Sequence, residues 1–516
     1  MATDESTPTT STTDEGSATE EQSLAERGSN RSQRPDSMAF RDFMSQHWAP
    51  RDTSLPEENA SAPWAKARRE RLSEAFAGER LVIPAGDLKV RSNDTDYAFR
   101  PHSAFSHMTG TGAKVEPGAV LVLHPLEEGG HEAILYFHPC ASRDTDEFFA
   151  DSRYGEFWVG ARPTLEYMQA ATGIRTAHID ELGDALAKDA GQVTLRVVRE
   201  ASETVNAQVA EIRSQVGQAD SAELDNAFAE ALSEARLIKD EWELEQMCLA
   251  VDATADGFAD MIRSLPRARE HHRGERVLEG AFGARAREEG NDVGYETIAA
   301  AGNHANTLHW TDNDGTVRDG DLVLIDAGIE VDSLYTADIT RTLPINGRFS
   351  PAQRRVYDAV LKACEASLAA AHGRGVKFRD IHAAAMEVIA HELEDMGILP
   401  ISAGESLQPD SQLHRRWMVH GTSHHLGLDV HDCAQARREM YLDAELQPGM
   451  CFTIEPGLYF HEDDLIVPEE YRGIGVRIED DVYITEDYRA VRMSEDIPRT
   501  ADEVEAWMAG ILDADA

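Results

Sequence analysis

The feature that most constrains this chain is the stretch from residue 322 to residue 342, LVLIDAGIEVDSLYTADITRT. An apolar run ends in Asp326, the polar stretch 330–333 is typical of a turn, and a second strand-like run follows Asp338. A hairpin centred on residue 332 would place the two carboxylates opposite each other on one face, with Cβ atoms about 5 Å apart. A half-buried pair of this kind needs a shared proton or a cation between the two groups. Taken alone, however, two such residues are more often one solvated turn Asp and one hydrogen-bonded Asp, so other segments have to decide.

Length and composition set the class of protein. A chain of 516 residues is too long for one ordinary core and predicts two domains plus tails. No run of about 18 apolar residues could span a membrane. The net charge of -45 argues against nucleic acid or an anionic membrane as a partner. Five cysteines without CxxC spacing predict reduced thiols, and the N-terminus lacks the pattern of a secretory signal, so we expect a cytoplasmic protein.

The order of patterns along the chain predicts two α/β domains. Residues 1–37 are rich in Ser, Thr, Glu and Pro and predict a disordered acidic tail. A helical stretch at 39–78 is followed by strands alternating with helices up to residue 200 and by a helix and connector at 201–240, which together predict an N-terminal α/β domain over residues 38–235. A second domain, with two rounds of helices followed by strands, is expected over 236–509. Residues 510–516 are expected to form a C-terminal tail.

Three further clusters carry residues that suit metal chemistry. The segment HGTSHHLGLDVHD at 420–432 concentrates histidines around glycines that let the backbone approach a ligand closely. In TIEPGLY at 453–459, an apolar strand ends in Glu455 where the chain turns. In GVRIEDD at 475–481, a strand would point Arg477 and Glu479 to one face, while Val476 and Ile478 pack into the core. Each of the last two clusters, by itself, would be an ordinary strand end or a strand with an ion pair.

Combined with the first stretch, these clusters predict a dinuclear metal site. Its ligands would be four carboxylates and one imidazole: Asp326, Asp338, Glu455, Glu479 and His424. Four negative ligands balance two divalent cations. Oxygen-dominated ligation with one imidazole favours Mn²⁺, with Co, Fe or Zn as competitors. Two such ions about 3.5–4 Å apart can bridge and ionise a water molecule, which gives the nucleophile of a hydrolase.

The segments LHWTDN, LVLIDAG, ADITRT, HGTSHHLGLDVHD, TIEPGLY and GVRIEDD resemble, in order and spacing, the catalytic domain of aminopeptidase P. This is the Xaa-Pro aminopeptidase of the pita-bread metallopeptidases, which also include prolidase and methionine aminopeptidase. The resemblance covers about residues 236–509. The upstream segment DYAFRPHSAFSHMTG looks like the N-terminal domain of the same enzyme, which methionine aminopeptidases generally lack. The implied fold is α/β (α+β), a pita-bread catalytic domain with a smaller α/β N-terminal domain.

The resemblance also implies a role for each matching residue. Asp326 would chelate one metal ion, Asp338 and Glu479 would bridge both, and His424 and Glu455 would bind the other. Glu455 would also handle the proton of the bridging hydroxide. His431 would steady the scissile carbonyl and its oxyanion. Further residues would line the site for proline and the peptide beyond it: His309, His420, Tyr459 and Arg477, with Tyr295 near the proline pocket.

The expected activity is release of the N-terminal residue from peptides with proline in second position, by a cytoplasmic enzyme that the resemblance predicts to be a homodimer or homotetramer. Prolidase is an alternative, because it shares all five ligands and differs in preferring dipeptides. A metal-free binding protein on the same fold is a second alternative. Such proteins are expected to have lost ligands, whereas this chain keeps a competent side chain at all five positions.

Overall fold

The computed structural model describes residues 35, 37–93, 95–218 and 221–514. The chain divides into two compact units, which are described separately. The small unit consists of the described residues up to Thr53 together with Cys140–Arg162, and the larger unit of Ser54–Pro139 and the chain from Pro163 onward. The predicted acidic tail at 1–37 lies outside the described residues except for Pro35 and Ser37.

The small unit contains three short helices, α2 (Met38–Met44), α5 (Glu147–Ala150) and α6 (Glu156–Val159). Its residues are joined by ion pairs of Glu156 with Arg51 at 2.5 Å and with Arg143 at 2.9 Å. The Trp48 ring packs edge-on against Phe148, with ring centroids 5.4 Å apart. Aromatic contacts and a shared carboxylate therefore hold together two segments that are distant in the sequence.

The helical stretch expected at 39–78 is interrupted. Helix α2 ends at Met44, and the next helix, α3, spans Ala62–Ala75 in the larger unit. Pro50 and Pro56 lie between them, and proline lacks the backbone N–H that a helix interior requires. Pro63 is tolerated because it lies in the first turn of α3.

The N-terminal domain of the larger unit is built on a five-stranded sheet in the order β6-β5-β4-β1-β7. The strands are β1 (Arg80–Pro84), β4 (Val120–Pro125), β5 (His131–Phe137), β6 (Arg175–His178) and β7 (Leu195–Val197), with a separate small hairpin of β2 (Val90–Ser92) and β3 (Thr95–Asp96). Strand β4 lies antiparallel to both β1 and β5, whereas β1–β7 and β5–β6 are parallel pairs. The α/β domain expected here is therefore a mixed sheet.

Helices cover both faces of this sheet because side chains alternate along its strands. Leu121 packs on one face with Phe105 and Phe228, and Val122 packs on the other with Val209. The first face is covered by α3, α4 (Ser103–Thr109), α7 (Leu165–Thr172) and α10 (Ala222–Glu234), and the second by α8 (Leu182–Ala187) and α9 (Glu203–Gln215).

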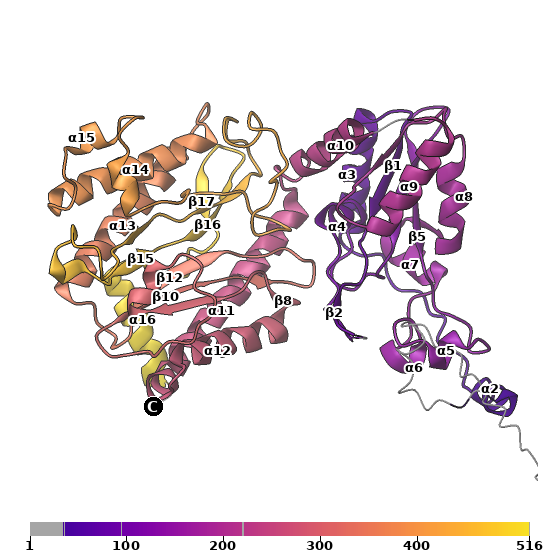
Figure 1. Ribbon diagram of the computed structural model, residues 1–516, viewed down its shortest axis with the longest axis horizontal. Helices are drawn as coiled ribbons and strands as arrows, with labels where there is room; N and C mark the ends of the chain where they lie inside the picture. Colours follow the sequence, from indigo (N-terminus) through magenta and orange to yellow (C-terminus); the bar gives the residue numbers. More distant parts are fainter. Residues whose placement is uncertain (1–34, 36, 94, 219–220, 515–516) are drawn as a thin grey trace, which may run out of the picture. The chain divides into compact units, whose positions relative to one another are not determined.

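The second domain of the larger unit has two rounds of a helix pair followed by strands. The first round is α11 (Glu241–Glu270), α12 (Gly274–Glu289), β8 (Asp292–Val293), β9 (Ile298–Ala301), β10 (Leu322–Ala327), β11 (Ile329–Glu330) and β12 (Ile339–Pro344). The second is α13 (Pro351–Ala370), α14 (Phe378–Asp395), α15 (Ala403–Ser406), β13 (Cys451–Ile454), β14 (Gly457–Tyr459), β15 (Gly475–Arg477), β16 (Asp480–Ile484) and β17 (Ala490–Arg492). In Figure 1 the strands lie between the pair α11–α12 and the pair α13–α14.

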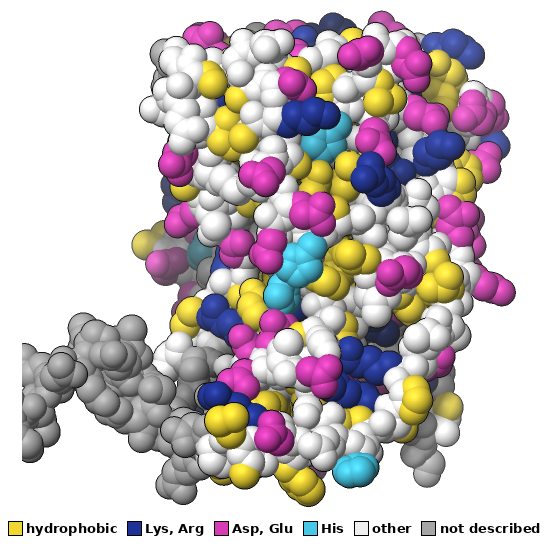
Figure 2. Space-filling view, turned by 90° about the vertical axis from the view of Figure 1, so that its right-hand side faces the viewer, with side chains coloured by type: hydrophobic (Ala, Val, Ile, Leu, Met, Phe, Trp, Pro, Cys, Tyr) yellow, Lys and Arg dark blue, Asp and Glu magenta, His cyan; other side chains and the backbone are white. Residues whose placement is uncertain are grey.

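The last helix, α16 (Ala501–Ala514), extends beyond the expected domain end at residue 509. Residues 510–514 are helical instead of forming a tail, because Ile511 and Leu512 continue the apolar side of the helix and pack against the core. Among the described residues, every helix is too short or too polar to cross a bilayer. Acidic, basic and apolar side chains are interspersed on the face shown in Figure 2.

Candidate active site

Asp326 and Asp338 belong to the hairpin of β10 and β12, here called the aspartate hairpin (residues 322–344), and its register differs from the prediction. Asp326 pairs with Thr340, and a bridge between Glu330 and Thr336 closes the hairpin. The centre is therefore at residue 333, and the predicted centre at 332 was wrong by one residue. Asp338 is a diagonal neighbour of Asp326 instead of its direct partner.

The turn extends past the polar stretch, because the Val331 N–H donates to the Tyr335 carbonyl at 3.0 Å. Leu334 adopts a left-handed backbone with φ 73°, and the Tyr335 hydroxyl donates to Glu243 Oε1 at 2.7 Å on helix α11. Diagonal neighbours still share a face of the sheet. The Tyr295 hydroxyl accordingly lies 2.6 Å from Asp326 Oδ1 and 2.5 Å from Asp338 Oδ1.

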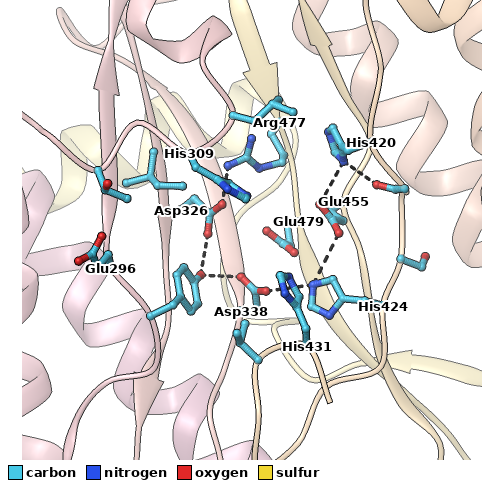
Figure 3. Close-up of a pocket in the computed structure, with 17 residues that line it drawn as sticks. Glu296, His309, Asp326, Asp338, His420, His424, His431, Glu455, Arg477 and Glu479 are labelled. Carbon is cyan, nitrogen blue, oxygen red and sulfur yellow. Dashed lines mark hydrogen bonds and ion pairs between the residues drawn. The ribbon is translucent and has the colours of Figure 1, made fainter. Parts of the chain in front are cut away.

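Three residues from the second round of strands complete the cluster. Glu455 follows β13, and Glu479 occupies the break between β15 and β16, where its Oε2 accepts a hydrogen bond from the Thr340 hydroxyl at 2.7 Å. His424 Nε2 lies 3.2 Å from Asp338 Oδ2 and 3.6 Å from Glu455 Oε1. Figure 3 shows Glu479 among the other carboxylates, and Asp338, His424 and Glu479 offer ligand atoms within 4.8 Å of one another.

The electrostatics of this cluster suit bound cations. Burial, together with repulsion from neighbouring carboxylates, raises the pKa of Asp326, raises that of Glu455 to about 7 and raises that of Glu479 well above its usual range. Burial alone would lower the pKa of His424, but Asp338 and Glu455 outweigh burial and raise it to about 9. Without bound cations, the four carboxylates and His424 therefore concentrate excess negative charge away from water. A donor set of four carboxylates and one imidazole fits divalent metal ions, which would supply the compensating charge.

A second chain of contacts forms the wall beside the carboxylates. The Arg477 guanidinium pairs with Asp326 and donates from Nη1 to the Tyr459 hydroxyl at 3.1 Å. That hydroxyl lies 2.8 Å from His420 Nε2, and His420 Nδ1 lies 3.5 Å from Glu455 Oε2. Arg477 and Tyr459 are buried, whereas His420 and Glu455 are partly exposed, so this chain of contacts runs from the protein interior to the pocket.

All these groups surround one pocket of about 590 Å³. Its walls include every residue named as a candidate from the sequence except Tyr459, which lies behind Arg477 and His420. The His431 ring stands edge-on to His424 with centroids 4.4 Å apart. Other lining residues were not singled out from the sequence: Glu296, Ile298, Leu308, Thr311, Gly421, Ser423 and Val430. Most lie within three positions of a named candidate, so their proximity in the sequence was the one available signal.

Comparison with known proteins identifies the family. The model of metallopeptidase family M24 matches residues 244–486, and that of the aminopeptidase P N-terminal domain matches residues 65–198. Xaa-Pro aminopeptidase 2 of Streptomyces coelicolor is 48% identical over 448 residues, which cover 87% of this chain and 91% of the relative. The chain belongs to the aminopeptidase P family of M24 metallopeptidases.

Other members of the aminopeptidase P family extend the match. Xaa-Pro aminopeptidase 1 of S. coelicolor is 47% identical over 91% of both chains, and the Xaa-Pro aminopeptidase of Escherichia coli is 33% identical over 86% of this chain and 96% of its own length. The structure of E. coli aminopeptidase P in its low-pH form has a TM-score of 0.77 at 30% identity and covers 88% of this chain and 99% of that chain. The predicted pita-bread catalytic domain with a smaller α/β N-terminal domain is thereby confirmed.

Proposed function

We propose that this metallopeptidase is a dinuclear metal-dependent aminopeptidase that hydrolyses the bond between the N-terminal residue of a peptide and a proline in second position. The observation that carries the proposal is the buried cluster of four carboxylates and His424, which opens into one pocket together with His309, His431 and Arg477. The names of the curated relatives, which are Xaa-Pro aminopeptidases, support the substrate class.

The metal ions would be held by the residues predicted from the sequence: Asp326, Asp338, His424, Glu455 and Glu479. Asp338 and Glu479 would bridge both ions, Asp326 would chelate one, and His424 with Glu455 would bind the other. We propose Mn²⁺ as the bound metal, with Co, Fe or Zn as competitors, because the donor set is mostly oxygen. Bound divalent ions would lower the pKa of a water molecule and so supply the hydrolytic nucleophile at neutral pH.

The remaining side chains would position the substrate and move protons. Glu455 would accept a proton at its carboxylate during attack and pass it towards the leaving proline nitrogen. His431 would donate a hydrogen bond to the developing oxyanion of the scissile carbonyl. His309, His420 and Arg477 would line the proline side, with Tyr459 supporting the last two, and Tyr295 would lie near the proline pocket.

A comparison of substrates tests this proposal against prolidase. Purified enzyme with added Mn²⁺ should release the first residue from Xaa-Pro-Yaa tripeptides and longer peptides. Activity confined to Xaa-Pro dipeptides would instead establish a prolidase. Protein that binds no Mn²⁺ in a calorimetric titration would support the third candidate, a binding protein on the same fold.

We propose a homodimer or homotetramer, as the family resemblance implies, and light scattering of the purified protein would determine its mass in solution. A cytoplasmic location is supported by five cysteines that all remain free thiols. The domain boundary near residue 235 remains our proposal, and the two family matches fall on either side of it.

A further inference from the structure

The loop between β9 and β10 carries one candidate residue into the pocket from the side opposite the histidine-rich segment. Leu308, His309 and Thr311 of this loop line the cavity. Figure 3 shows the His309 ring beside Arg477 and Asp326. His309 is solvent-exposed, so packing of its own ring does not hold it in place. Its position therefore depends on how the loop backbone is anchored.

The Glu275 carboxylate anchors that loop, alongside the Asn313 side chain, which bonds to Ala299 and Thr297. Glu275 lies in the first turn of α12, and its side chain is fully buried. Its Oε1 accepts from the Ala301 N–H at 2.8 Å and lies 2.8 Å from His304 Nδ1. Its Oε2 accepts from the Trp310 indole N–H at 2.9 Å and from the Gly315 N–H at 2.6 Å. One side chain thus contacts the residue before the loop, two residues within it and Gly315 in its second half.

The contact of Glu275 with Trp310 acts on the residue that follows His309 in the sequence. The Trp310 ring stacks on His304 with centroids 3.9 Å apart and planes inclined by 26°. The packing leaves no room for a side chain at position 315, because a Cβ on Gly315 would lie 2.7 Å from both Glu275 Oε2 and the His304 ring. The Trp310 side chain is therefore held by its N–H and by its face, which restrains the backbone that carries His309.

The chemistry of the site requires a carboxylate. A carboxylate has acceptors on both oxygens, whereas a glutamine would turn an NH₂ group either towards the Ala301 N–H or towards the N–H groups of Trp310 and Gly315. Leaving buried N–H groups without an acceptor costs more than the bond itself contributes. We propose that Glu275 is a positioning residue that acts through Trp310 and the loop to hold His309 in its substrate-binding orientation. The inference rests on the proposed function, because it is there that His309 contacts the substrate.

A double-mutant cycle tests the coupling. Glu275→Gln should lower kcat/KM for an Xaa-Pro-Yaa peptide by about 10- to 100-fold, because small displacements of a positioning group cost that much. In the His309→Ala background the same substitution should change kcat/KM by less than about 3-fold, since the group it positions is already absent. Trp310→Phe keeps the stacked ring and loses the N–H, and should reproduce part of the Glu275→Gln effect.

Glu505→Gln is the matched control. Glu505 on α16 also caps a loop, accepting from the Phe349 N–H at 3.0 Å and pairing with Arg348 at 2.6 Å, and it is not among the pocket-lining residues. Its substitution should leave kcat/KM unchanged. Metal content and thermal midpoint, measured for every variant, separate lost positioning from lost folding.

Hydrogen exchange gives a readout that does not depend on activity. The amide protons of Ala301 and Gly315 should be protected in the wild-type enzyme and should exchange faster in Glu275→Gln, but not in Glu505→Gln. Unchanged protection, or an equal loss of kcat/KM in the presence and absence of His309, would overturn the positioning role. A wild-type enzyme that cleaves no Xaa-Pro-Yaa peptide while its loop amides respond as expected would refute the proposed function and leave the loop anchor standing.

Discussion

At the scale of single residues, the pocket brings together the side chains that we propose as metal ligands and those that we propose as substrate contacts. Asp338, His424 and Glu479 bring ligand atoms within 4.8 Å of one another. His431 lines the same pocket and contacts the His424 ring, but lies outside that tight group. His309 reaches the pocket from a different loop. The loss of a ligand and the loss of a substrate contact should therefore have different consequences.

Substitution of His431 and Asp338 tests this separation. His431→Ala should lower kcat by about 100- to 1,000-fold, the cost of removing an oxyanion donor, with metal content nearly intact. Asp338→Ala should lose both activity and metal. Metal analysis of the dialysed variants, combined with steady-state kinetics, distinguishes the two, and equal metal loss would refute the assigned roles.

Glu296 leads to a second prediction, on substrate charge. It adds an exposed carboxylate to the pocket wall next to Tyr295. Glu296→Gln should reduce the ratio of kcat/KM for peptides beginning Arg-Pro to that for peptides beginning Glu-Pro by about 30-fold, because ~1 kcal/mol of charge interaction in water favours the Arg peptide and a similar amount disfavours the Glu peptide. The ratio for Ala-Pro and Leu-Pro peptides should not change. If wild type and Glu296→Gln have the same charge preference at low salt, the Glu296 side chain does not reach the substrate.

At the scale of elements, the aspartate hairpin depends on close backbone approach. A Cβ on Gly328 would lie 1.7 Å from the Ala337 carbonyl oxygen, so any side chain there must push the two strands apart. The strand expected at 475–481 likewise breaks in two. β15 pairs with β14 and β16 with β13, which turns Glu479 towards the hairpin. The carboxylates meet because these short strands change partners at the site.

The hairpin argument predicts the effect of Gly328→Ala. The displaced strands should weaken Mn²⁺ binding and lower the thermal midpoint even though no ligand is changed. Gly283→Ala in helix α12 is the control, because its Cβ would meet nothing within 4 Å and helical alanine is favoured by up to about 1 kcal/mol. Wild-type metal affinity in Gly328→Ala would contradict the close approach.

A buried carboxylate in the N-terminal domain predicts how stability depends on pH. Burial tends to raise the pKa of Asp225, but a bidentate contact from Arg213, the Val197 N–H and Arg199 outweigh burial and lower it. With a folded-state pKa below the unfolded value of about 3.9, Asp225 stabilises the fold above about pH 4, and this contribution is lost as the pH falls towards the folded-state pKa.

Urea unfolding of Asp225→Asn checks the sign. The variant should be about 3 kcal/mol less stable than the wild type at pH 7, the cost of leaving a buried guanidinium without its partner. The difference should shrink at pH 3. Asp487→Asn, which removes an exposed ion pair with Arg489, should leave the free energy of unfolding nearly unchanged at either pH.

At the scale of the whole molecule, the N-terminal domain supports the metal-binding part of the catalytic domain. The Ala113 N–H donates to the Asp332 carbonyl at 3.0 Å, in the turn of the aspartate hairpin. Tyr335 of the same turn bonds to Glu243, which also lies 3.4 Å from the Arg68 guanidinium of the N-terminal domain. Contacts between the domains thus reach the turn between Asp326 and Asp338, which gives the N-terminal domain a structural part in forming the site.

Arg68→Met tests this contact between the domains. Arg68 is almost fully buried and donates twice to Asp240, at 2.9 and 2.7 Å. Its loss should destabilise the enzyme by about 3–5 kcal/mol, because buried carboxylates lose their partner. Arg175→Met, in an exposed pair with Glu132, should cost at most about 1 kcal/mol. Equal denaturation midpoints for the two variants would refute the supporting role.

The amino-acid sequence by itself determined the family, the two domains and the set of candidate residues. Glycine-flanked histidines and strand-end carboxylates are local patterns, and they can be recognised in the sequence alone. Only the tertiary structure decided how they meet. The hairpin is centred one residue later than predicted because its turn closes through backbone hydrogen bonds of Val331 with Leu334 and Tyr335. Glu275, Glu296 and the loop contacts around Trp310 carry no recognisable pattern, since their partners are brought together by packing across segments. Hydrogen bonds and buried charge act between neighbours in space, and sequence order specifies those neighbours only within an element.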